Sequence, residues 1–200
     1  MLVIGLTGPS GAGKGEVASV FRSYGIPVID ADEVYHALLT PPSPCLDALC
    51  ARFGTEILKN DGTLDRPCLG SIVFSDPAAL ADLNAISHRY VMEDIQQWLD
   101  SLRKSDTAVA VIDAPQLFEA GADKLCASIV AVLADRETRA TRIMARDGID
   151  RESAMRRINA QKSDAFFREK SDFVIENDAS VDSIAPLVRD VLYRLGVSAP

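Results

Sequence analysis

Residues 2–21, LVIGLTGPSGAGKGEVASVF, contain three features in the order that a phosphate-binding loop requires. The apolar run LVIGL comes first and predicts a strand that is covered on both faces. A glycine-rich turn follows, in which Gly8, Gly13 and Lys14 match the pattern G-x-x-x-x-G-K-[ST]. Apolar residues then recur at helical spacing over 15–24. A strand, a glycine-rich turn and a helix in this order predict a site for nucleotide phosphates.

Position 15 departs from this pattern, because Gly15 stands where a serine or threonine ordinarily supplies a hydroxyl ligand to Mg²⁺. The rest of the loop is intact. Its glycines permit close backbone approach, its N–H groups can point inward, and the helix N-terminus adds positive potential. Lys14 can reach the β and γ phosphates of a nucleotide. The sequence therefore predicts nucleotide binding and leaves open whether the loop also catalyses.

The composition of the whole chain limits the class of protein. Its 200 residues are enough for one domain with small insertions, and 48% apolar with 25% charged residues is ordinary for a soluble globular protein. A net charge of −8 argues against general nucleic-acid binding. No apolar run approaches the roughly 18 residues of a membrane span, and the first run is too short and lacks the basic flank of a signal peptide. We expect a cytoplasmic protein without nucleic-acid or membrane partners.

The four cysteines form no C-x-x-C pair. Only His36 and His88 could join them at a metal. Spacing of this kind favours reduced thiols that are buried or incidental. We therefore predict neither a disulfide nor a structural metal.

Outward from the loop, strand-length apolar runs alternate with helical patterns. This alternation predicts an α/β fold with a doubly wound parallel sheet. The predicted strands are Leu2–Leu6, Ile26–Ile29, Thr107–Ile112, Ser128–Leu133 and Phe173–Ile175. The predicted helices cover 15–24, 46–53, 88–104, 137–147 and 181–195.

Two regions interrupt the alternation. The turn-rich segments TPPSP at 40–44 and NDGTLDRPCL at 60–69 have neither strand nor helix period, so residues 33–87 are predicted to form a helical insertion. Residues 136–170 form a second insertion, which holds ten of the 21 basic residues but six of the 29 acidic ones. A basic segment in an acidic protein indicates a local anionic ligand, and the alternative is a solvated helix of mixed charge.

Carboxylates follow two of the predicted strands. Asp30 and Asp32 follow the second strand, where one can cap the next helix and the other can accept the proton of an attacking hydroxyl. We favour Asp32 for the functional role. Asp113 ends the third strand, at the position of a carboxylate that holds a metal directly or through water. Glu119 lies in the loop beyond and is either a substrate-side residue or an exposed loop acid.

Arginines recur on one face of a predicted helix in the basic segment. Arg139, Arg142 and Arg146 stand at i, i+3 and i+7. Phosphoryl transfer needs cations over the moving group, and a closing basic lid can supply them. We predict that the central Arg142 has this role and that Arg146 contacts substrate, although surface helices often carry arginines without any function.

These segments together resemble the dephospho-CoA kinase family over nearly the full length. The specific pieces are GIPVIDADE, DGTLDR, ISHRYV, DAPQLFEAG, ETRATRIMARDGIDRESAMRRINAQ and SDFVIENDAS, which accompany the glycine-rich loop. The resemblance implies a P-loop kinase domain over 1–200 with a five-stranded core. It also implies a helical coenzyme A-binding domain that matches 33–87 and a lid that matches 136–160.

The family's functional residues carry over to individual positions. Its proposed base falls on Asp32, its lid arginine on Arg142, and a residue beside the adenine on Asn177. His88 and Arg66 match substrate-side positions. The ATP-binding residues that the resemblance implies are Gly8, Gly11, Ala12, Gly13, Lys14, Gly15, Glu16 and Asn177.

The chain departs from the family pattern at four positions. Arg89, Gln116 and Arg139 stand where proline, leucine and glutamine are usual, and these changes affect packing or the outer site. Gly15 replaces a serine and affects the chemistry. Adenylate kinases have a similar loop, GAGKG, and are active with a metal held mainly through water, a geometry that Mg²⁺ tolerates. Glu16 either repels the phosphates or binds a water on the metal.

The motifs and the resemblance predict an enzyme that uses ATP and Mg²⁺ to phosphorylate the ribose 3′-hydroxyl of dephospho-CoA, which is the last step of coenzyme A synthesis. Lys14, Asp32 and Arg142 are its predicted catalytic residues, and Asp113 supports the metal through water. One alternative is another small-molecule or nucleoside monophosphate kinase, against which the 33–87 insertion with DGTLDR argues. Another is a non-catalytic nucleotide-binding regulator, which only Gly15 favours.

Overall fold

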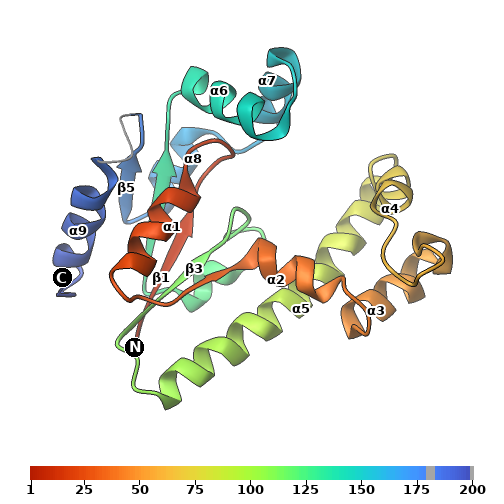
Figure 1. Cartoon of the computed structure of the whole chain (residues 1–200), viewed down its shortest axis with the longest axis horizontal. Helices are drawn as coiled ribbons and strands as arrows, with labels where there is room; N and C mark the ends of the chain where they lie inside the picture. The colour runs from red at the N-terminus through yellow and green to blue at the C-terminus, as the bar shows by residue number, and fades with distance from the viewer. Residues whose placement is uncertain (179–182, 199–200) are drawn as a thin grey trace. The chain divides into compact units, whose positions relative to one another are not determined.

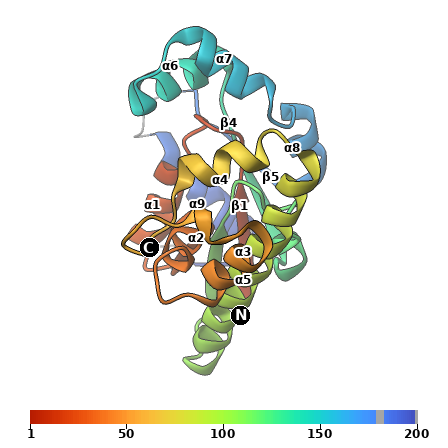
Figure 2. The ribbon, with the colours of Figure 1, turned by 90° about the vertical axis from the view of Figure 1, so that its right-hand side faces the viewer.

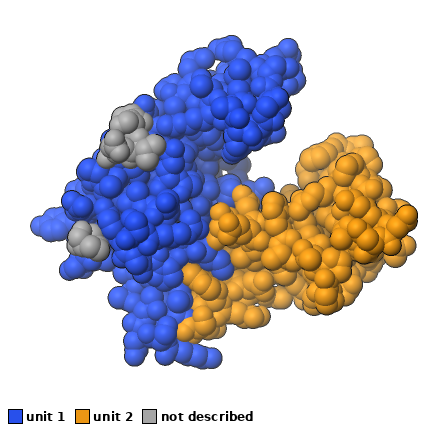
Figure 3. All heavy atoms as spheres, in the orientation of Figure 1, with its two compact units in different colours: residues 1–29, 102–200 blue, residues 30–101 orange. Residues whose placement is uncertain are grey.

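The computed structural model describes residues 1–178 and 183–198, which divide into two compact units. Unit 1 comprises Met1–Ile29 and Leu102–Pro200, and unit 2 comprises Asp30–Ser101 (Figures 1 and 3). Unit 1 contains the glycine-rich loop and the arginine-rich segment, whereas unit 2 contains the helices of the predicted insertion.

The sheet of unit 1 has the strand order β2-β3-β1-β4-β5, and its strands are parallel. Its members are β1 (Leu2–Thr7), β2 (Val28–Asp30), β3 (Val109–Asp113), β4 (Ser128–Leu133) and β5 (Phe173–Glu176). The register pairs Leu6 with Asp113 and Thr7 with Ala131. The carboxyl ends of the three central strands therefore meet at one edge. The predicted α/β fold with a doubly wound, parallel, five-stranded sheet is confirmed.

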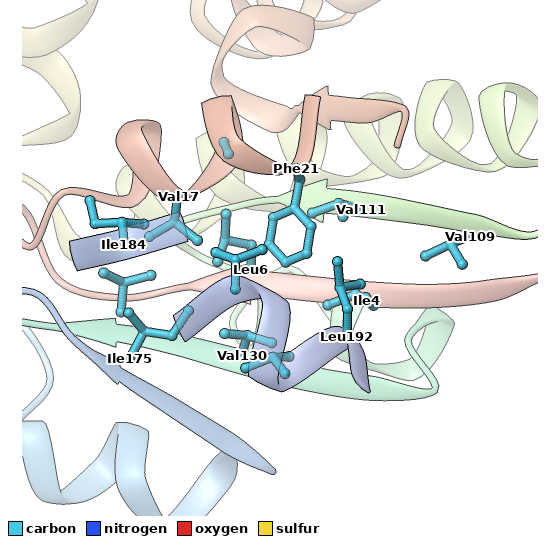
Figure 4. Close-up of a cluster of buried hydrophobic side chains, with 14 of the residues drawn as sticks. Ile4, Leu6, Val17, Phe21, Val109, Val111, Val130, Ile175, Ile184 and Leu192 are labelled. Carbon is cyan, nitrogen blue, oxygen red and sulfur yellow. The ribbon is translucent and has the colours of Figure 1, made fainter. Parts of the chain in front are cut away.

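One face of the sheet is covered by α1 (Lys14–Ser23) and α9 (Ile184–Arg194), as Figure 4 shows. Ile4 and Leu6 of β1 alternate onto this face, where they pack with Phe21 of α1 and Leu192 of α9. All four side chains are fully buried. Burial of each contributes about 1.5–3 kcal/mol to the free energy of unfolding. This core fixes the start of α1, and so the end of the glycine-rich loop, against the sheet.

The opposite face is also covered. Ala131 and Leu133 of β4 pack against Phe167 of α8 (Asp164–Lys170). Phe118 joins this cluster from the loop after β3, with its ring edge-on to that of Phe166 at 5.4 Å. Burial on both faces is why the strands have continuous apolar runs instead of alternating ones.

The basic segment forms a helical hairpin that leads into α8. Its helices are α6 (Arg136–Asp147) and α7 (Arg151–Asn159), which lie side by side in Figures 1 and 2. They pack through Ile143 and Ile158, among others. Asp135 and Asp150 cap the two helices, and Gly148 ends α6 in a left-handed conformation. The sequence predicted α6 within one residue and missed α7 and α8.

Ion pairs within the hairpin neutralise much of its basic charge. Arg151 pairs with Glu137, Arg156 with Glu152, and Arg157 with Asp147. These pairs are exposed, so each contributes little to stability. Carboxylates within the hairpin therefore neutralise much of the excess positive charge that the sequence shows. Any charge that has no such partner lies on individual arginines.

Unit 2 is helical. It contains α2 (Ala31–Leu38), α3 (Pro44–Phe53), η1 (Thr55–Ile57), α4 (Arg66–Val73) and most of α5 (Pro77–Lys104). Leu49, Ile57 and Leu69 lie in its hydrophobic core. The unit starts at Asp30, before residue 33, and ends at Ser101, after residue 87. It continues past residue 87 because α5 is one continuous helix, which begins eleven residues before the predicted start at 88.

The prediction that 60–69 contains no helix is wrong at its end, because α4 begins at Arg66. The first part is a turn: the Lys59 amide donates to the Thr63 carbonyl at 2.8 Å, and Leu58 bridges to Leu64. The Asp65 carboxylate then accepts from the Cys68 amide and caps α4, with proline in the first turn. An aspartate cap followed by proline is a helix-start signal that the turn residues before it obscured.

Three further observations concern the cysteines, the helices and the possible metal ligands. All four cysteines are free thiols, and burial raises the pKa of Cys126 to about 12. Within 1–178 and 183–198, no helix combines the length and the hydropathy that crossing a membrane would need. In the same ranges, no group of three or more His, Cys, Asp or Glu side chains is arranged to hold a metal ion.

Candidate active site

The glycine-rich loop is packed so closely that side chains are excluded at Gly8, Gly11 and Gly13. Gly13, with φ of 89°, precedes α1, and a Cβ there would lie 2.0 Å from Nδ2 of Asn177. Gly11, with φ of 81°, would place a Cβ 2.7 Å from the carbonyl oxygen of Arg139. Both the positive φ and the close contacts require glycine. The loop therefore lies directly against the end of β5 and against α6, with which it builds the site.

Lys14 and Asp113 meet at the carboxyl edge of the sheet. The Lys14 ammonium lies 2.5 Å from Oδ1 of Asp113, and Asp113 is only 2% exposed. The parallel register places Asp113 beside Leu6, one residue before the strand ends and the loop begins. A buried carboxylate is stable when a cation neutralises it. The pair also holds the Lys14 side chain across the loop.

All three arginines of the predicted stripe face the loop. Arg139 Nε donates to the Ser10 carbonyl at 3.0 Å, and Arg146 Nη2 contacts Ser10 Oγ at 3.3 Å. Arg142 Nη1 lies 3.4 Å from the carbonyl oxygens of both Gly11 and Ala12. The predicted spacing therefore brings one face of α6 onto the loop.

The three arginines differ in charge compensation. Arg139 pairs with Asp164 at 3.3 Å and Arg146 with Asp147 at 2.7 Å. For Arg142, the residues that the structure describes supply no carboxylate within ion-pair distance. Its partners are the two carbonyl oxygens, which it contacts at the long distance of 3.4 Å. Arg142 is thus the member of the stripe whose charge is left for an anion beside the loop.

Asn177 connects the end of β5 with the loop and with α1. It is 1% exposed, and its Nδ2 donates to the Ala12 carbonyl at 2.9 Å and to Oε2 of Glu16 at 3.0 Å. One oxygen of the Glu16 carboxylate therefore accepts from a side-chain amide. The Oδ1 atom of Asn177 is buried and has no hydrogen-bond partner among the described residues. It is an acceptor that a ligand could satisfy.

Gly15 lies in the first turn of α1, where no unusual backbone conformation is needed. Its φ is not positive, and a Cβ there would meet nothing within 4 Å. A serine at position 15 would therefore be unstrained. Glycine at this position therefore removes a hydroxyl without serving the local fold.

Asp30 caps α2, and Asp32 does not. The Asp30 carboxylate accepts from the amides of Asp32 at 2.8 Å and Glu33 at 3.2 Å. The predicted division of roles is confirmed for the cap. Asp32 lies exposed in the first turn of α2, two residues after β2, so its carboxylate is not used by the helix start.

Three further residues were predicted on the substrate side: Arg66, His88 and Glu119. Arg66 is exposed at the start of α4, and His88 is half-buried on α5. Burial raises the pKa of Tyr35, while the nearby charge of Arg66 opposes the rise. Glu119 is exposed in the turn after β3.

Sequence reasoning missed the contact between Ser10, a residue of the loop, and Gln161. The Ser10 amide donates to Oε1 of Gln161 at 3.1 Å, across 151 positions of sequence. Neither residue stands in a periodic pattern. A lone glutamine after a helix gives no local signal of such a distant contact.

The comparison with family models accounts for nearly the whole chain. Residues 2–183 match the model described as dephospho-CoA kinase. The chain belongs to the dephospho-CoA kinase family. A dephospho-CoA kinase from Syntrophotalea carbinolica is 37% identical over 202 residues, which cover 100% of this chain and 96% of the relative.

Two solved structures are similar to this chain over nearly its whole length. A crystal structure of a Thermus thermophilus protein is 32% identical, covers 97% of both chains and has a TM-score of 0.81. A dephospho-CoA kinase from Campylobacter jejuni is 26% identical, covers 96% of both chains and has a TM-score of 0.71. The family is one of kinases.

Proposed function

We propose that this chain transfers the γ-phosphoryl group of ATP to the ribose 3′-hydroxyl of dephospho-CoA and releases coenzyme A and ADP. Membership of the family supports the reaction as a whole. The observation that carries it to this chain is the convergence on one loop of Lys14, buried Asp113 and an arginine, Arg142, without a carboxylate partner. A site that must bind and then neutralise a polyphosphate needs these charges.

In the proposed reaction, Lys14 and the loop amides bind the β and γ phosphates. Lys14 exchanges its contact with Asp113 for the phosphates, which leaves the carboxylate of Asp113 beside the bound nucleotide. Arg142 exchanges two long contacts with carbonyl groups for charge-assisted hydrogen bonds to the transferred group, and such bonds are the stronger ones. The Arg142 contribution grows as negative charge spreads over the phosphoryl oxygens in the transition state.

Mg²⁺ bound with ATP would neutralise phosphate charge and orient the phosphates. The residues present fit this ion. A carboxylate oxygen is a ligand that Mg²⁺ prefers, and the ion is usually bound through one or two carboxylates, waters and substrate phosphates. Asp113 is the residue that would hold it, through water while Lys14 remains nearby. Gly15 supplies no hydroxyl, so more of the coordination would come from water.

Asp32 is proposed as the base that receives the proton of the attacking hydroxyl. Its support is that the Asp30 side chain serves as the helix cap, while the Asp32 carboxylate is exposed just after a strand of the sheet. Arg66, His88, Glu119 and Arg146 are proposed on the side of dephospho-CoA. Unit 2 is proposed to bind the coenzyme A moiety, and residues 136–160 are proposed as the lid.

The adenine of ATP is proposed to lie beside Asn177. Its support is the buried Oδ1 atom, which accepts no hydrogen bond from the described residues. An unsatisfied buried acceptor is costly, and the exocyclic amine of adenine is a donor that would satisfy it. A cytoplasmic location is proposed as well, because free thiols persist in reducing compartments.

The test is ADP release from ATP and Mg²⁺ with four acceptors in parallel: dephospho-CoA, AMP, CMP and pantothenate. We expect turnover with dephospho-CoA and none above background with the others. Lys14→Ala should abolish turnover while circular dichroism stays unchanged. Turnover with a different acceptor would assign another small-molecule kinase. ATP binding without turnover on any acceptor would assign the non-catalytic regulator.

A further inference from the structure

We propose that Arg139 and Gln161 are positioning residues for the nucleotide, which hold the main chain of Ser10 from both sides and so fix the glycine-rich loop before ATP binds. The inference rests on the proposed binding of ATP by this loop. It concerns nucleotide affinity and not the phosphoryl-transfer step.

The contacts around Ser10 form a closed ring. The Ser10 amide donates to Oε1 of Gln161 at 3.1 Å, and the Ser10 carbonyl accepts from Nε of Arg139 at 3.0 Å. Nη2 of Arg139 donates to the same Gln161 oxygen at 3.0 Å. Both main-chain polar groups of one loop residue are therefore held by two side chains, which also bind each other.

Arg139 is buried and its charge is paired. It is 2% exposed, and its third nitrogen, Nη1, pairs with Oδ1 of Asp164 at 3.3 Å. Burial lowers the pKa of Arg139, and the charge of Asp164 opposes this effect. A buried charge persists only when it is paired and hydrogen-bonded. Because protein acceptors occupy all three nitrogens, this guanidinium is not available to a phosphate, in contrast to Arg142.

The loop needs such support because of its composition. Ser10 stands between Gly8 and Gly11, and three glycines of the loop have positive φ. Glycine loses more conformational freedom on ordering than any other residue. A loop that is already ordered binds its ligand more tightly, because less entropy is lost on binding. Arg139 from α6 and Gln161 after α7 supply this order from outside the loop.

The test measures ADP binding by calorimetry in the full chain, so it needs no acceptor substrate. Arg139→Ala and Gln161→Ala are each expected to raise the Kd for ADP about tenfold, the size of one lost charge-assisted hydrogen bond. The two side chains act as one ring. The double variant should therefore raise the Kd for ADP by much less than the product of the two single-variant increases. Arg156→Ala is the matched control, since Arg156 is an exposed arginine paired with Glu152 on α7. Its Kd should equal that of the wild type.

Two readouts separate positioning from a general loss of structure. Gln161→Glu keeps the acceptor oxygen and should restore the Kd to within about threefold of the wild type, whereas Gln161→Ala should not. Amide hydrogen exchange at Ser10 should be slow in the wild type and in Gln161→Glu and fast in Gln161→Ala. Variants that lower Tm but bind ADP with the wild-type Kd would overturn the inference, as would equal affinities of Gln161→Glu and Gln161→Ala. Absence of turnover with dephospho-CoA would refute the proposed reaction and leave this measurement intact.

Discussion

At the scale of the residue, position on a helix does not separate the three arginines of α6, but charge compensation does. Arg139 and Arg146 each have a carboxylate partner, and Arg142 contacts the Gly11 and Ala12 carbonyls instead. Moving Arg142 onto a phosphoryl group breaks two long contacts and no ion pair. It is therefore the arginine from which a transition-state contribution is expected.

Arg142→Ala is expected to lower kcat about 10²–10³-fold, as for other lost donors to a charged transition state. The Kd for ADP, which lacks the transferred group, should change little. Steady-state kinetics measures kcat, and calorimetry measures the Kd for ADP. In Arg139→Ala, the Kd for ADP should rise and kcat should change less than in Arg142→Ala. A larger loss of kcat in Arg139→Ala than in Arg142→Ala would mean that the wrong arginine carries the chemistry.

At Gly15, we expect the wild type to be active and to require Mg²⁺. A Cβ there meets nothing within 4 Å, so Gly15→Ser and Gly15→Ala should both fold as the wild type does. Serine restores a hydroxyl ligand that alanine cannot supply. The Mg²⁺ concentration for half-maximal kcat should therefore be lower in Gly15→Ser than in Gly15→Ala. Equal Mg²⁺ dependence would exclude residue 15 from the metal's surroundings, and activity only in Gly15→Ser would identify a non-catalytic protein.

Asp32→Asn should lower kcat by about 10²–10⁴, the range for loss of a general base, with ATP affinity little changed. Asp30→Asn is the matched control two residues away. Asparagine caps helices about as well as aspartate, so this variant should keep both its stability and its kcat. An equal loss of ATP affinity in Asp32→Asn would place Asp32 in the nucleotide or metal site instead.

At the scale of the element, α1 connects the core to the site. Its first residue, Lys14, pairs with Asp113, and Phe21 two turns later is fully buried between the sheet and α9. The depth of Phe21 in the core therefore sets how firmly the loop end is held.

Phe21→Ala should lower the free energy of unfolding by about 3–5 kcal/mol, the usual cost of removing a buried aromatic ring. Urea denaturation measures it as a lower midpoint. Arg22→Ala, on the exposed side of the same helix, should stay within about 0.5 kcal/mol of the wild type. A cost near zero for Phe21→Ala would show that the α1–sheet core does not hold this end of the fold.

At the scale of the whole molecule, the proposed lid should respond to both substrates. We expect hydrogen exchange within 136–160 to slow when ATP and dephospho-CoA bind together, and more than with either alone, because the arginine face of α6 then closes on charged ligand. Helix α9 should exchange at the same rate in all states. Unchanged exchange in 136–160 would count against a lid.

The sequence by itself determined the sheet and the loop, because both depend on local patterns. Buried parallel strands need continuous apolar runs, and Ser128–Leu133 was predicted with its final bounds. The motif ending in Lys14 and the arginine spacing in α6 are also local patterns, and it is the fold that brings the two together. Starts of α4 and α5 were missed where turn residues precede a capped or proline-led helix.

Only the tertiary structure decided which polar groups are already satisfied. Gln161 reaches Ser10 across 151 positions, Asn177 reaches Glu16 across 161, and Asp164 neutralises Arg139. Hydrogen bonds and ion pairs between distant segments leave no period in a sequence, because each needs one side chain at one place. The sequence could therefore name the charged residues of the site, and the fold alone determined which of them, Arg142 above all, is left for a ligand.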